Sequence, residues 1–251
     1  MPPRSFMQLR TRCITMKLYA HPGASSLSVH ILLRETELPF ELEVVNATDK
    51  TRAFGGDYRA INPRGMVPAL ELDDGTILTE NLVIAQYLCD VAGRRDLMPA
   101  PGTKQRHDVM EWQSFIAAEL HKATSLLFWP LDEDAKAFVR RRISMKYRIV
   151  EDALAGKPIV TGDQFTAADA YLFPILSWAS FFKIDLSSFP NIEGFLRRVG
   201  KRPSLVQALL AEGPGLVTIL EDEKAAANVK GAYLSAGTIR LKARAPYRCP
   251  R

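Results

Sequence analysis

Residues 62–81 read NPRGMVPALELDDGTILTEN, and this pattern predicts a loop, two short strands and the start of a helix. The strands are expected at residues 67–72 and 76–78. An Asp-Asp-Gly turn joins them, because Gly75 tolerates the positive φ that a tight hairpin turn requires. The helix is expected to begin near Glu80. The segment is therefore interpreted as a β-hairpin that leads into a helix.

Pro68 sets the start of the first of these strands. Proline cannot donate a hydrogen bond to a sheet, so Pro68 is expected at the first residue or at the edge of its strand. A cis bond there would bend the chain and leave the main-chain amide and carbonyl of Val67 free. An extended, peptide-like ligand can pair with such a free backbone.

A second segment, PGASSLSVH at residues 22–30, follows the apolar run of residues 16–19 and begins an amphipathic pattern. It places the hydroxyl of Ser25 where a strand gives way to a helix. The first amides of a helix have no intrahelical partner and carry the positive end of its dipole, so they favour an anion such as a thiolate or carboxylate. On its own, Pro-Gly followed by Ser more often marks a turn and a helix N-cap. This pattern therefore leaves both interpretations open.

The rest of the chain, from residue 103 to residue 212, shows helical periodicity. Apolar residues recur in a helix-like pattern in two stretches: Val109, Trp112, Phe115, Ile116 and Leu120, then Phe138, Ile143, Tyr147, Ile149 and Leu154. Further along, Thr166 and Asp169 have the spacing of a capping box, flanked by Phe165 and Ala170 at the positions of a hydrophobic staple. We expect a helical second domain in which Asp169 has a structural role.

Composition narrows the class of protein. At 251 residues, with 47% hydrophobic and 24% charged residues, the chain is long enough for one or two ordinary cores. No apolar run approaches the roughly 18 residues of a membrane span. The net charge of +5 is concentrated in residues 1–15 and 213–251, which leaves residues 16–212 with a net charge of −2. Neither a nucleic-acid surface nor a membrane role is therefore predicted.

The three cysteines, Cys13, Cys89 and Cys249, show neither CxxC spacing nor an even disulfide framework. This usage is typical of a reducing compartment and favours a cytoplasmic protein. Cys89 ends an apolar helical pattern and is expected to be a small buried hydrophobe. Residues 1–15 are expected to form a disordered extension, with Met16 as the functional start, and residues 213–251 a flexible basic tail.

Four motifs follow one another along the chain: PGASSLSVH, NPRGMVPAL with DGTILTEN, ELHK after EWQSFIA, and GDQFTAADAYLF. Residues 16–90 resemble the thioredoxin-like domain of the glutathione transferases, and residues 16–212 resemble the bacterial beta class of that family. The resemblance implies an α/β thioredoxin-like domain with a mixed four-stranded sheet at residues 16–93, then an all-helical bundle domain at residues 103–212. It also implies a homodimer.

The resemblance makes glutathione the ligand and its thiolate the anion beside Ser25. Beta-class relatives commonly carry a cysteine where Ser25 stands, and that cysteine can form a mixed disulfide with glutathione. Serine cannot form one, so the expected mechanism is that of the serine-type transferases. Lowering a thiol pKa from about 8.5 by two units requires about 2.7 kcal/mol. A hydroxyl hydrogen bond to a charged acceptor supplies about 1.5 to 3 kcal/mol and the helix end up to about 1 kcal/mol, so neither cysteine nor metal is required. Ser26 is the competing hydroxyl.

Further site residues are carried over from the family pattern. In that pattern Lys50 meets a glutathione carboxylate, the Val67 backbone before Pro68 pairs with the cysteinyl unit, and Glu80 receives the amino group. The Asn81 amide is implied to face a carboxylate at the helix start. Two residues are implied to reach the active site from the helical domain: His121, a catalytic residue near the sulfur together with Ser25, and Lys122, near the edge of the ligand.

Two functions from different classes remain open. The first is an enzyme whose glutathione thiolate attacks a small hydrophobic electrophile held between the domains. The second is a related protein that binds glutathione or apolar ligands without turnover, or serves as an interaction scaffold. Retained Lys50, Glu80 and His121 favour the enzyme. Ser114 and Ala118, where relatives often have Asn and a hydroxyl residue, favour the scaffold, as does the lost cysteine.

Overall fold

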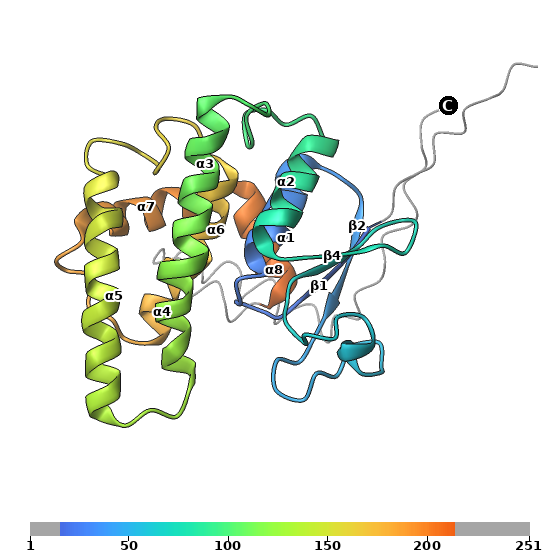
Figure 1. Cartoon of the computed structure of the whole chain (residues 1–251), viewed down its shortest axis with the longest axis horizontal. Coiled ribbons are helices and arrows are strands. Elements are labelled where there is room, and N and C mark those ends of the chain that lie inside the picture. Colours follow the sequence, from blue (N-terminus) through green and yellow to red (C-terminus); the bar gives the residue numbers. More distant parts are fainter. Residues whose placement is uncertain (1–15, 214–251) are drawn as a thin grey trace, which may run out of the picture.

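A computed structural model describes residues 16–213 of the chain. The extension predicted for residues 1–15 and, apart from Gly213, the tail predicted for residues 213–251 lie outside the described residues. The described part consists of a sheet with two helices, followed by a group of helices (Figure 1).

The sheet has four strands: β1 (Met16–Ala20), β2 (Phe40–Val44), β3 (Ala69–Glu71) and β4 (Ile77–Thr79). Their order in the sheet is β2-β1-β3-β4, with β1 and β2 parallel and the other neighbours antiparallel. The predicted mixed four-stranded sheet is confirmed. The hairpin is confirmed too, although its first strand begins at Ala69 rather than residue 67.

The two faces of the sheet bury different side chains because successive residues of a strand point to opposite sides. Met16, Leu18 and Ala20 join the main core with helices α1 (Leu27–Thr36) and α2 (Asn81–Val91). Tyr19, which lies between Leu18 and Ala20 in β1, faces the other side of the sheet. There it packs in a smaller cluster that includes Tyr58, from the loop before β3.

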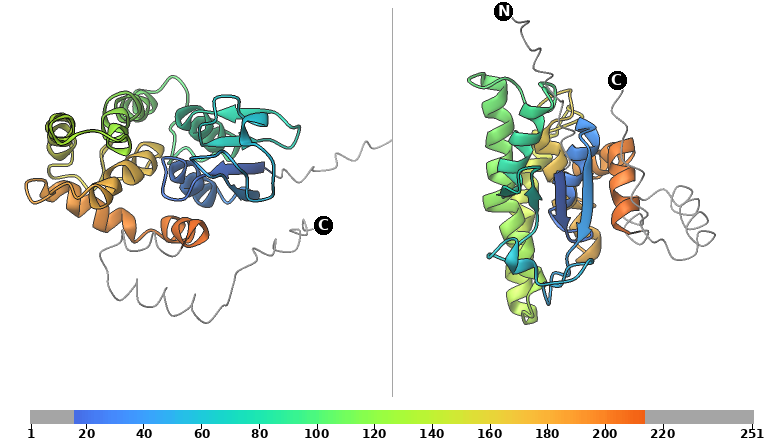
Figure 2. Two further views of the ribbon diagram at one scale, coloured as in Figure 1. Left: turned by 90° about the horizontal axis from the view of Figure 1, so that it is seen from below. Right: turned by 90° about the vertical axis from the view of Figure 1, so that its right-hand side faces the viewer.

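The helical part contains α3 (Lys104–Phe115), a π-helical segment η2 (Ile116–His121), α4 (Lys122–Ser125), the short turn η3 (Leu126–Phe128), α5 (Glu133–Ala153), α6 (Ala167–Phe181), α7 (Pro190–Gly200) and α8 (Pro203–Glu212). Helix α6 is almost entirely buried, and α1 packs directly against both α6 and α8. Seen from below, α5, α3 and α2 form one layer, and α6, α7, α8 and α1 lie on its other side (Figure 2). The two parts of the chain therefore share one continuous core.

The helical periodicity is confirmed in outline and wrong in two places. Phe138 and Ile149 are about half exposed, and their neighbours Val139 and Val150 are buried instead. The three- and four-residue spacing of the buried face runs through Val139, Ile143, Tyr147, Val150 and Leu154, so three of the five predicted residues are buried as expected. The other error concerns the stretch through Ile116 and Leu120, which does not continue as one α-helix. It widens into the π-helical η2, a feature with no local sequence signal.

The predicted capping box begins α6. Asp169 is fully buried, and its Oδ2 accepts hydrogen bonds from the Thr166 amide at 2.9 Å and the Thr166 hydroxyl at 2.8 Å, while its Oδ1 accepts one from the Val160 amide. Phe165 and Ala170, the predicted staple residues, both belong to the core. Burial raises the pKa of Asp169 to about 6. The structural role expected for Asp169 agrees with this geometry.

Asp169→Ala is expected to lower the free energy of unfolding by about 1 to 2 kcal/mol at pH 7, because three buried donors lose their acceptor. Chemical denaturation measures this loss. Folding raises the pKa of Asp169, so the folded state binds the proton more tightly and the wild type loses stability as pH rises from about 4 to about 6. The loss caused by Asp169→Ala is therefore larger at pH 5 than at pH 7.

Asp163 provides the matched control, since it lies in the same loop and is exposed. Asp163→Ala is expected to change the free energy of unfolding by less than about 0.5 kcal/mol. Equal losses in the two variants would show that the capping contacts add nothing.

Two further findings concern residues 16–213. Within this range no helix is both long and apolar enough to cross a membrane. Cys89 is fully buried, as predicted, and burial raises the pKa of its thiol to about 12, so this thiol is not a nucleophile at neutral pH.

Candidate functional site

Three segments of the predicted site meet at one end of the sheet, where β1 and β4 finish and β3 begins. Tyr19 of β1 pairs with Ala69 of β3, and Ala69 pairs with Thr79 of β4. The turn that carries Ser25 leaves β1 at this end, the Val67-Pro68 bond enters β3 there, and α2 begins just beyond β4. Strand pairing therefore places these three segments, which are up to about 60 residues apart in sequence, next to one another at the same end of the sheet.

Ser25 lies in the turn immediately before α1. It is buried, and its hydroxyl hydrogen-bonds to no described residue. Within residues 16–213 the main-chain amides of Ser25 and Ser26 also have no acceptor, although the next amides, of Leu27 and Ser28, bond back to Ala24 and Ser25. One hydroxyl and two amides are thus available to an anion at the start of a helix.

Ser26 is already committed to the backbone of the turn. Its Oγ accepts from the His21 amide at 3.2 Å and donates to the His21 carbonyl at 3.3 Å, and the residue is fully buried. This arrangement ties the end of β1 to the start of α1. The geometry favours Ser25 over Ser26 as the hydroxyl that meets a ligand.

The helical part holds this turn through both main-chain polar groups of one residue, Gly23. Trp178 Nε1 donates to the Gly23 carbonyl at 2.9 Å, and the Gly23 amide donates to Glu212 Oε2 at 2.9 Å. The other carboxylate oxygen of Glu212 lies 2.9 Å from Nδ1 of His30, and both side chains are buried. Arg34 Nε approaches the second nitrogen of His30 as a donor, so His30 Nδ1 carries the hydrogen donated to Glu212. The position of Ser25 therefore depends on α6 and α8.

The Val67-Pro68 bond is cis, as the sequence suggested. Within the described residues the amide and carbonyl of Val67 take part in no backbone hydrogen bond, so they remain open to an extended ligand. Lys50 lies beside the same loop, with its side chain against Gly65. Its Nζ donates to the Ala47 carbonyl at 2.6 Å, so a ligand carboxylate would replace or share this contact.

The two residues at the start of α2 differ in their surroundings. Glu80 is exposed, has a positive φ of 71° and pairs with Arg64 at 3.2 Å. Asn81 is buried, and its Oδ1 accepts from the Ser28 hydroxyl at 2.7 Å. The Asn81 side chain is therefore part of the support under the site, and its main-chain amide is the part that can face a carboxylate.

His121 ends the π-helical η2 and lies between α6 and the site. Its ring packs edge-on against Trp178 at 5.2 Å between centroids, and its Nδ1 is 2.8 Å from the Tyr171 hydroxyl. Burial and the neighbouring Lys122 lower the pKa of His121 to about 4, so the imidazole is neutral at pH 7. Lys122 itself is exposed. Because Trp178 also bonds to Gly23, the structure brings His121 to the turn that carries Ser25.

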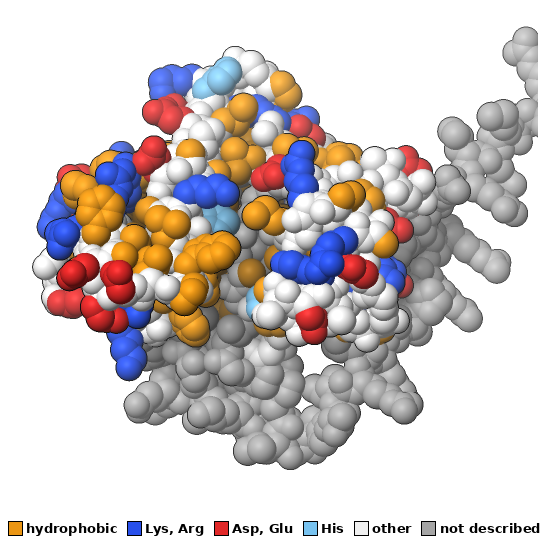
Figure 3. Space-filling view, turned by 60° about the horizontal axis from the view of Figure 1, so that its bottom comes forward, with side chains coloured by type: hydrophobic (Ala, Val, Ile, Leu, Met, Phe, Trp, Pro, Cys, Tyr) orange, Lys and Arg blue, Asp and Glu red, His pale blue; other side chains and the backbone are white. Residues whose placement is uncertain are grey.

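Aromatic side chains continue outward from Trp178. Phe128 packs on Trp178 at 5.1 Å and on Phe182 at 4.7 Å, and Phe181 lies 5.9 Å from Phe128. Phe128 is 53% exposed and Phe181 72%. Figure 3 shows hydrophobic side chains gathered beside a histidine at the hollow between the two parts of the molecule. We call Phe128, Trp178, Phe181 and Phe182 the aromatic wall.

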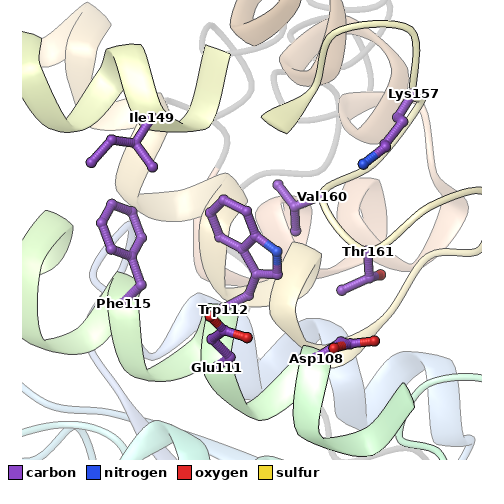
Figure 4. A pocket seen from close by; sticks show the side chains of 8 residues that line it. All are labelled: Asp108, Glu111, Trp112, Phe115, Ile149, Lys157, Val160 and Thr161. Atoms are coloured by element: carbon purple, nitrogen blue, oxygen red, sulfur yellow. The ribbon is translucent and has the colours of Figure 1, made fainter. Parts of the chain in front are cut away.

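The other aromatic residues of the helical part lie in two places. Phe128 and Trp129, at and just after the end of η3, are on the surface. Trp112 and Phe115 line a separate pocket of about 350 Å³ between α3 and α5 (Figure 4). Asp108, Glu111 and Lys157 at the rim of that pocket are not among the predicted site residues.

Three residues in this geometry were missed as functional candidates: Tyr171, Trp178 and Glu212. Tyr171 stands inside the quoted motif GDQFTAADAYLF, and Trp178 follows seven residues later, on the same helix face. That spacing was a usable signal. Glu212 gives none, because a single acid at the end of a helix is ordinary. Within residues 16–213 no group of three or more histidine, cysteine or acidic side chains is placed to hold a metal ion.

Family models match both parts of the chain. The model described as the N-terminal domain of glutathione S-transferase matches residues 24–91, and the model of the C-terminal domain matches residues 115–203. Among curated relatives, glutathione S-transferase GstA of Escherichia coli O157:H7 is 44% identical over 199 residues, which cover 79% of this chain and 99% of that protein. Glutathione S-transferase GST-4.5 of Xanthomonas campestris is 37% identical and is likewise 99% covered.

Solved structures agree with the sequence matches. A glutathione transferase from Methylococcus capsulatus superposes with a TM-score of 0.76 at 44% identity, covering 78% of this chain and 98% of that one. A sphingomonad glutathione S-transferase, solved in complex with glutathione, superposes with a TM-score of 0.75 at 36% identity and the same coverage.

Proposed function

This chain belongs to the glutathione S-transferase family, and from that premise we propose that Ser25 holds the glutathione sulfur as a thiolate for attack on a hydrophobic electrophile. One observation carries the proposal: at the end of the sheet that gathers the site, the Ser25 hydroxyl and the amides of Ser25 and Ser26 have no partner among the described residues. Three free donors at the start of a helix can stabilise a thiolate that neutral pH would otherwise protonate.

The other binding residues follow from the same end of the sheet. The free backbone of Val67 pairs with the cysteinyl unit, Lys50 and the Asn81 amide meet carboxylates, and Glu80 meets the amino group. Lys122 reaches the ligand from the helical domain. Glutathione releases its thiol proton to water, and its sulfur then forms a bond to the electrophilic atom while that atom gives up its leaving group.

Two measurements on the wild-type chain test this function. Retention on immobilised glutathione, followed by elution with the free tripeptide, tests binding. Conjugation of glutathione to an aromatic halide at pH 7 tests turnover. Retention without turnover toward any electrophile of this class would restore the non-catalytic alternative, and absence of retention would contradict the site itself.

We also propose that the aromatic wall binds the electrophile. Of its exposed rings, Phe128 is linked to His121 through Trp178, and Phe181 packs on Phe128 one ring further out. The double variant Phe128→Ala/Phe181→Ala is expected to raise KM for an aromatic electrophile about tenfold, because two stacking contacts of about 0.5 to 1.5 kcal/mol each are lost. Steady-state kinetics with each substrate varied in turn measures this change.

KM for glutathione should stay within about twofold in that double variant. The control is Phe54→Ala, since Phe54 is 70% exposed in the loop after β2 and packs on no other described ring. A tenfold rise in both KM values would show instead that the wall supports the whole site.

We propose a homodimer in a cytoplasmic setting. Helices α2 and α5, which lie in one layer (Figure 2), carry four exposed large apolar side chains: Val83, Val91, Met145 and Ile149. Exposed apolar side chains that adjoin one another are typical of a protein interface. The chain has a mass of 28.0 kDa, so light scattering during gel filtration should give about twice that value. A mass of one chain at micromolar concentration would contradict the dimer.

A further inference from the structure

Tyr171 stands between the helical domain and the glutathione site. Its ring is almost fully buried in α6, and its hydroxyl lies 2.8 Å from Nδ1 of His121. A hydroxyl and an imidazole nitrogen at this distance share one hydrogen, and either group can supply it. If the phenol supplies this hydrogen, the hydrogen of His121 is on Nε2 and can be donated to a ligand. If Nδ1 supplies it, Nε2 carries no hydrogen.

The surroundings of Tyr171 settle the direction of this hydrogen bond. Burial raises the pKa of the Tyr171 phenol, and its interaction with the Asn81 side chain lowers it. The Asn81 Oδ1 already accepts from the Ser28 hydroxyl at 2.7 Å, which leaves the amide nitrogen of Asn81 as the group free to meet the phenol, and an amide nitrogen can only donate. The Ser28 hydrogen is shared with the Ser25 carbonyl, 2.8 Å away. With the phenol oxygen already accepting from Asn81, its own hydrogen points to His121.

The protonation state of His121 completes the argument. The groups that face it are Tyr171 and Trp178 from α6 and Lys122 from its own segment, and none of them is an anion. Burial and Lys122 keep the imidazole neutral, so it carries one hydrogen on one nitrogen. If Nδ1 accepts from Tyr171, that hydrogen is on Nε2.

We propose that Tyr171 is the positioning residue for His121: it donates to Nδ1, fixes the Nε2–H tautomer and thereby makes His121 a hydrogen-bond donor to the glutathione sulfur. The role of His121 toward the sulfur rests on the proposed function, whereas its tautomer does not. The chain of contacts runs from Ser28 of α1 through Asn81 of α2 and Tyr171 of α6 to His121. The glutathione domain thus orients a side chain that the helical domain supplies.

The first test needs no activity. Long-range ¹H–¹⁵N spectra of the ligand-free, full-length protein at pH 7 report the tautomer of each of its four histidines, and His121→Gln assigns the signal of His121. The expected result is the Nε2–H tautomer in the wild type and a mixture of tautomers in Tyr171→Phe. An Nδ1–H tautomer in the wild type, or an unchanged signal in Tyr171→Phe, would overturn the positioning role even if the enzyme conjugates glutathione.

The second test uses kinetics. Tyr171→Phe keeps the buried ring and is expected to lower kcat about tenfold while KM for glutathione changes less than twofold. In the His121→Gln background the same substitution should cost nothing further, because the histidine it positions is gone. Additive losses would overturn the proposal.

Tyr147→Phe is the matched control, since Tyr147 is a fully buried tyrosine of α5 whose hydroxyl has no partner among the described residues. It should change neither the His121 signal nor kcat. A wild type that shows the expected tautomer but no conjugation would leave the positioning of His121 intact and count against the proposed function alone.

Discussion

Ser25→Ala is expected to lower kcat/KM for conjugation roughly 10- to 100-fold while the protein still binds glutathione. The hydroxyl is the side-chain donor at the start of α1 that no described residue occupies. A hydrogen bond to a charged acceptor contributes about 1.5 to 3 kcal/mol, and 1.36 kcal/mol corresponds to a tenfold change in rate. Binding survives because Val67, Lys50 and Asn81 contact other parts of the tripeptide in the proposed site.

The same substitution has a spectroscopic consequence. Without the hydroxyl, the bound thiol should ionise one to two pH units higher, because each unit corresponds to about 1.36 kcal/mol of preference for the thiolate. Thiolate absorbance of the complex, titrated between pH 5 and pH 9, measures the shift. An unchanged thiol pKa together with unchanged activity would remove Ser25 from the mechanism.

Ser26→Ala is the control for this experiment. Because the Ser26 hydroxyl bonds to the His21 backbone on both sides, its loss should cost about 1 kcal/mol of stability. Conjugation by the folded protein should fall no more than about threefold. If Ser26→Ala instead abolishes activity and raises the thiol pKa, the two serines exchange their assigned roles.

Glu212→Ala is expected to lower the free energy of unfolding by about 3 kcal/mol. Its carboxylate joins His30 and the Gly23 amide, and all of these groups are removed from solvent or nearly so. Removing the acceptor leaves two buried donors unpaired, and each costs about 1 to 3 kcal/mol. Equilibrium unfolding in urea, with the slope compared between variants, measures the loss.

The control comes from the same helix. Gln207 is exposed on α8, so Gln207→Ala should change the free energy of unfolding by less than about 0.5 kcal/mol. Gly23 belongs to the turn of Ser25. The Glu212→Ala molecules that remain folded should therefore also conjugate glutathione more slowly than the wild type. A loss below about 1 kcal/mol would mean that water replaces the carboxylate and that the contact with α8 does not hold the turn.

The parts of the structure predicted correctly from sequence depend on residues that are near one another in the chain. The hairpin follows from Gly75, the position of Pro68 from its missing amide hydrogen, and the capping box from the three-residue spacing of Thr166 and Asp169. Each of these signals acts within a few residues and needs no knowledge of packing. The resemblance to glutathione transferases then supplied the order of the domains.

The two errors differ in cause. Phe138 and Ile149 were assigned to the helical pattern, whereas the regular three- and four-residue spacing of the sequence runs through Val139, Ile143, Tyr147, Val150 and Leu154, which are all buried. The π-helical η2 keeps Ile116 and Leu120 in the core and places His121 against Tyr171 of α6. That widening has no signal within one turn of helix, so periodicity alone could not find it.

The sequence by itself determined the hairpin, the helical pattern behind it and the place of Ser25 at the start of a helix, because short-range turn, cap and strand signals specify them. The thioredoxin-like fold of the first domain was implied by the family resemblance. Tertiary structure alone decided which serine is free, and what holds it. The deciding contacts join residues 155 positions apart for Trp178 and Gly23 and 182 for Glu212 and His30. Such pairs meet only when α6 and α8 pack against α1, and that packing depends on the shape and burial of the whole core rather than on any local pattern.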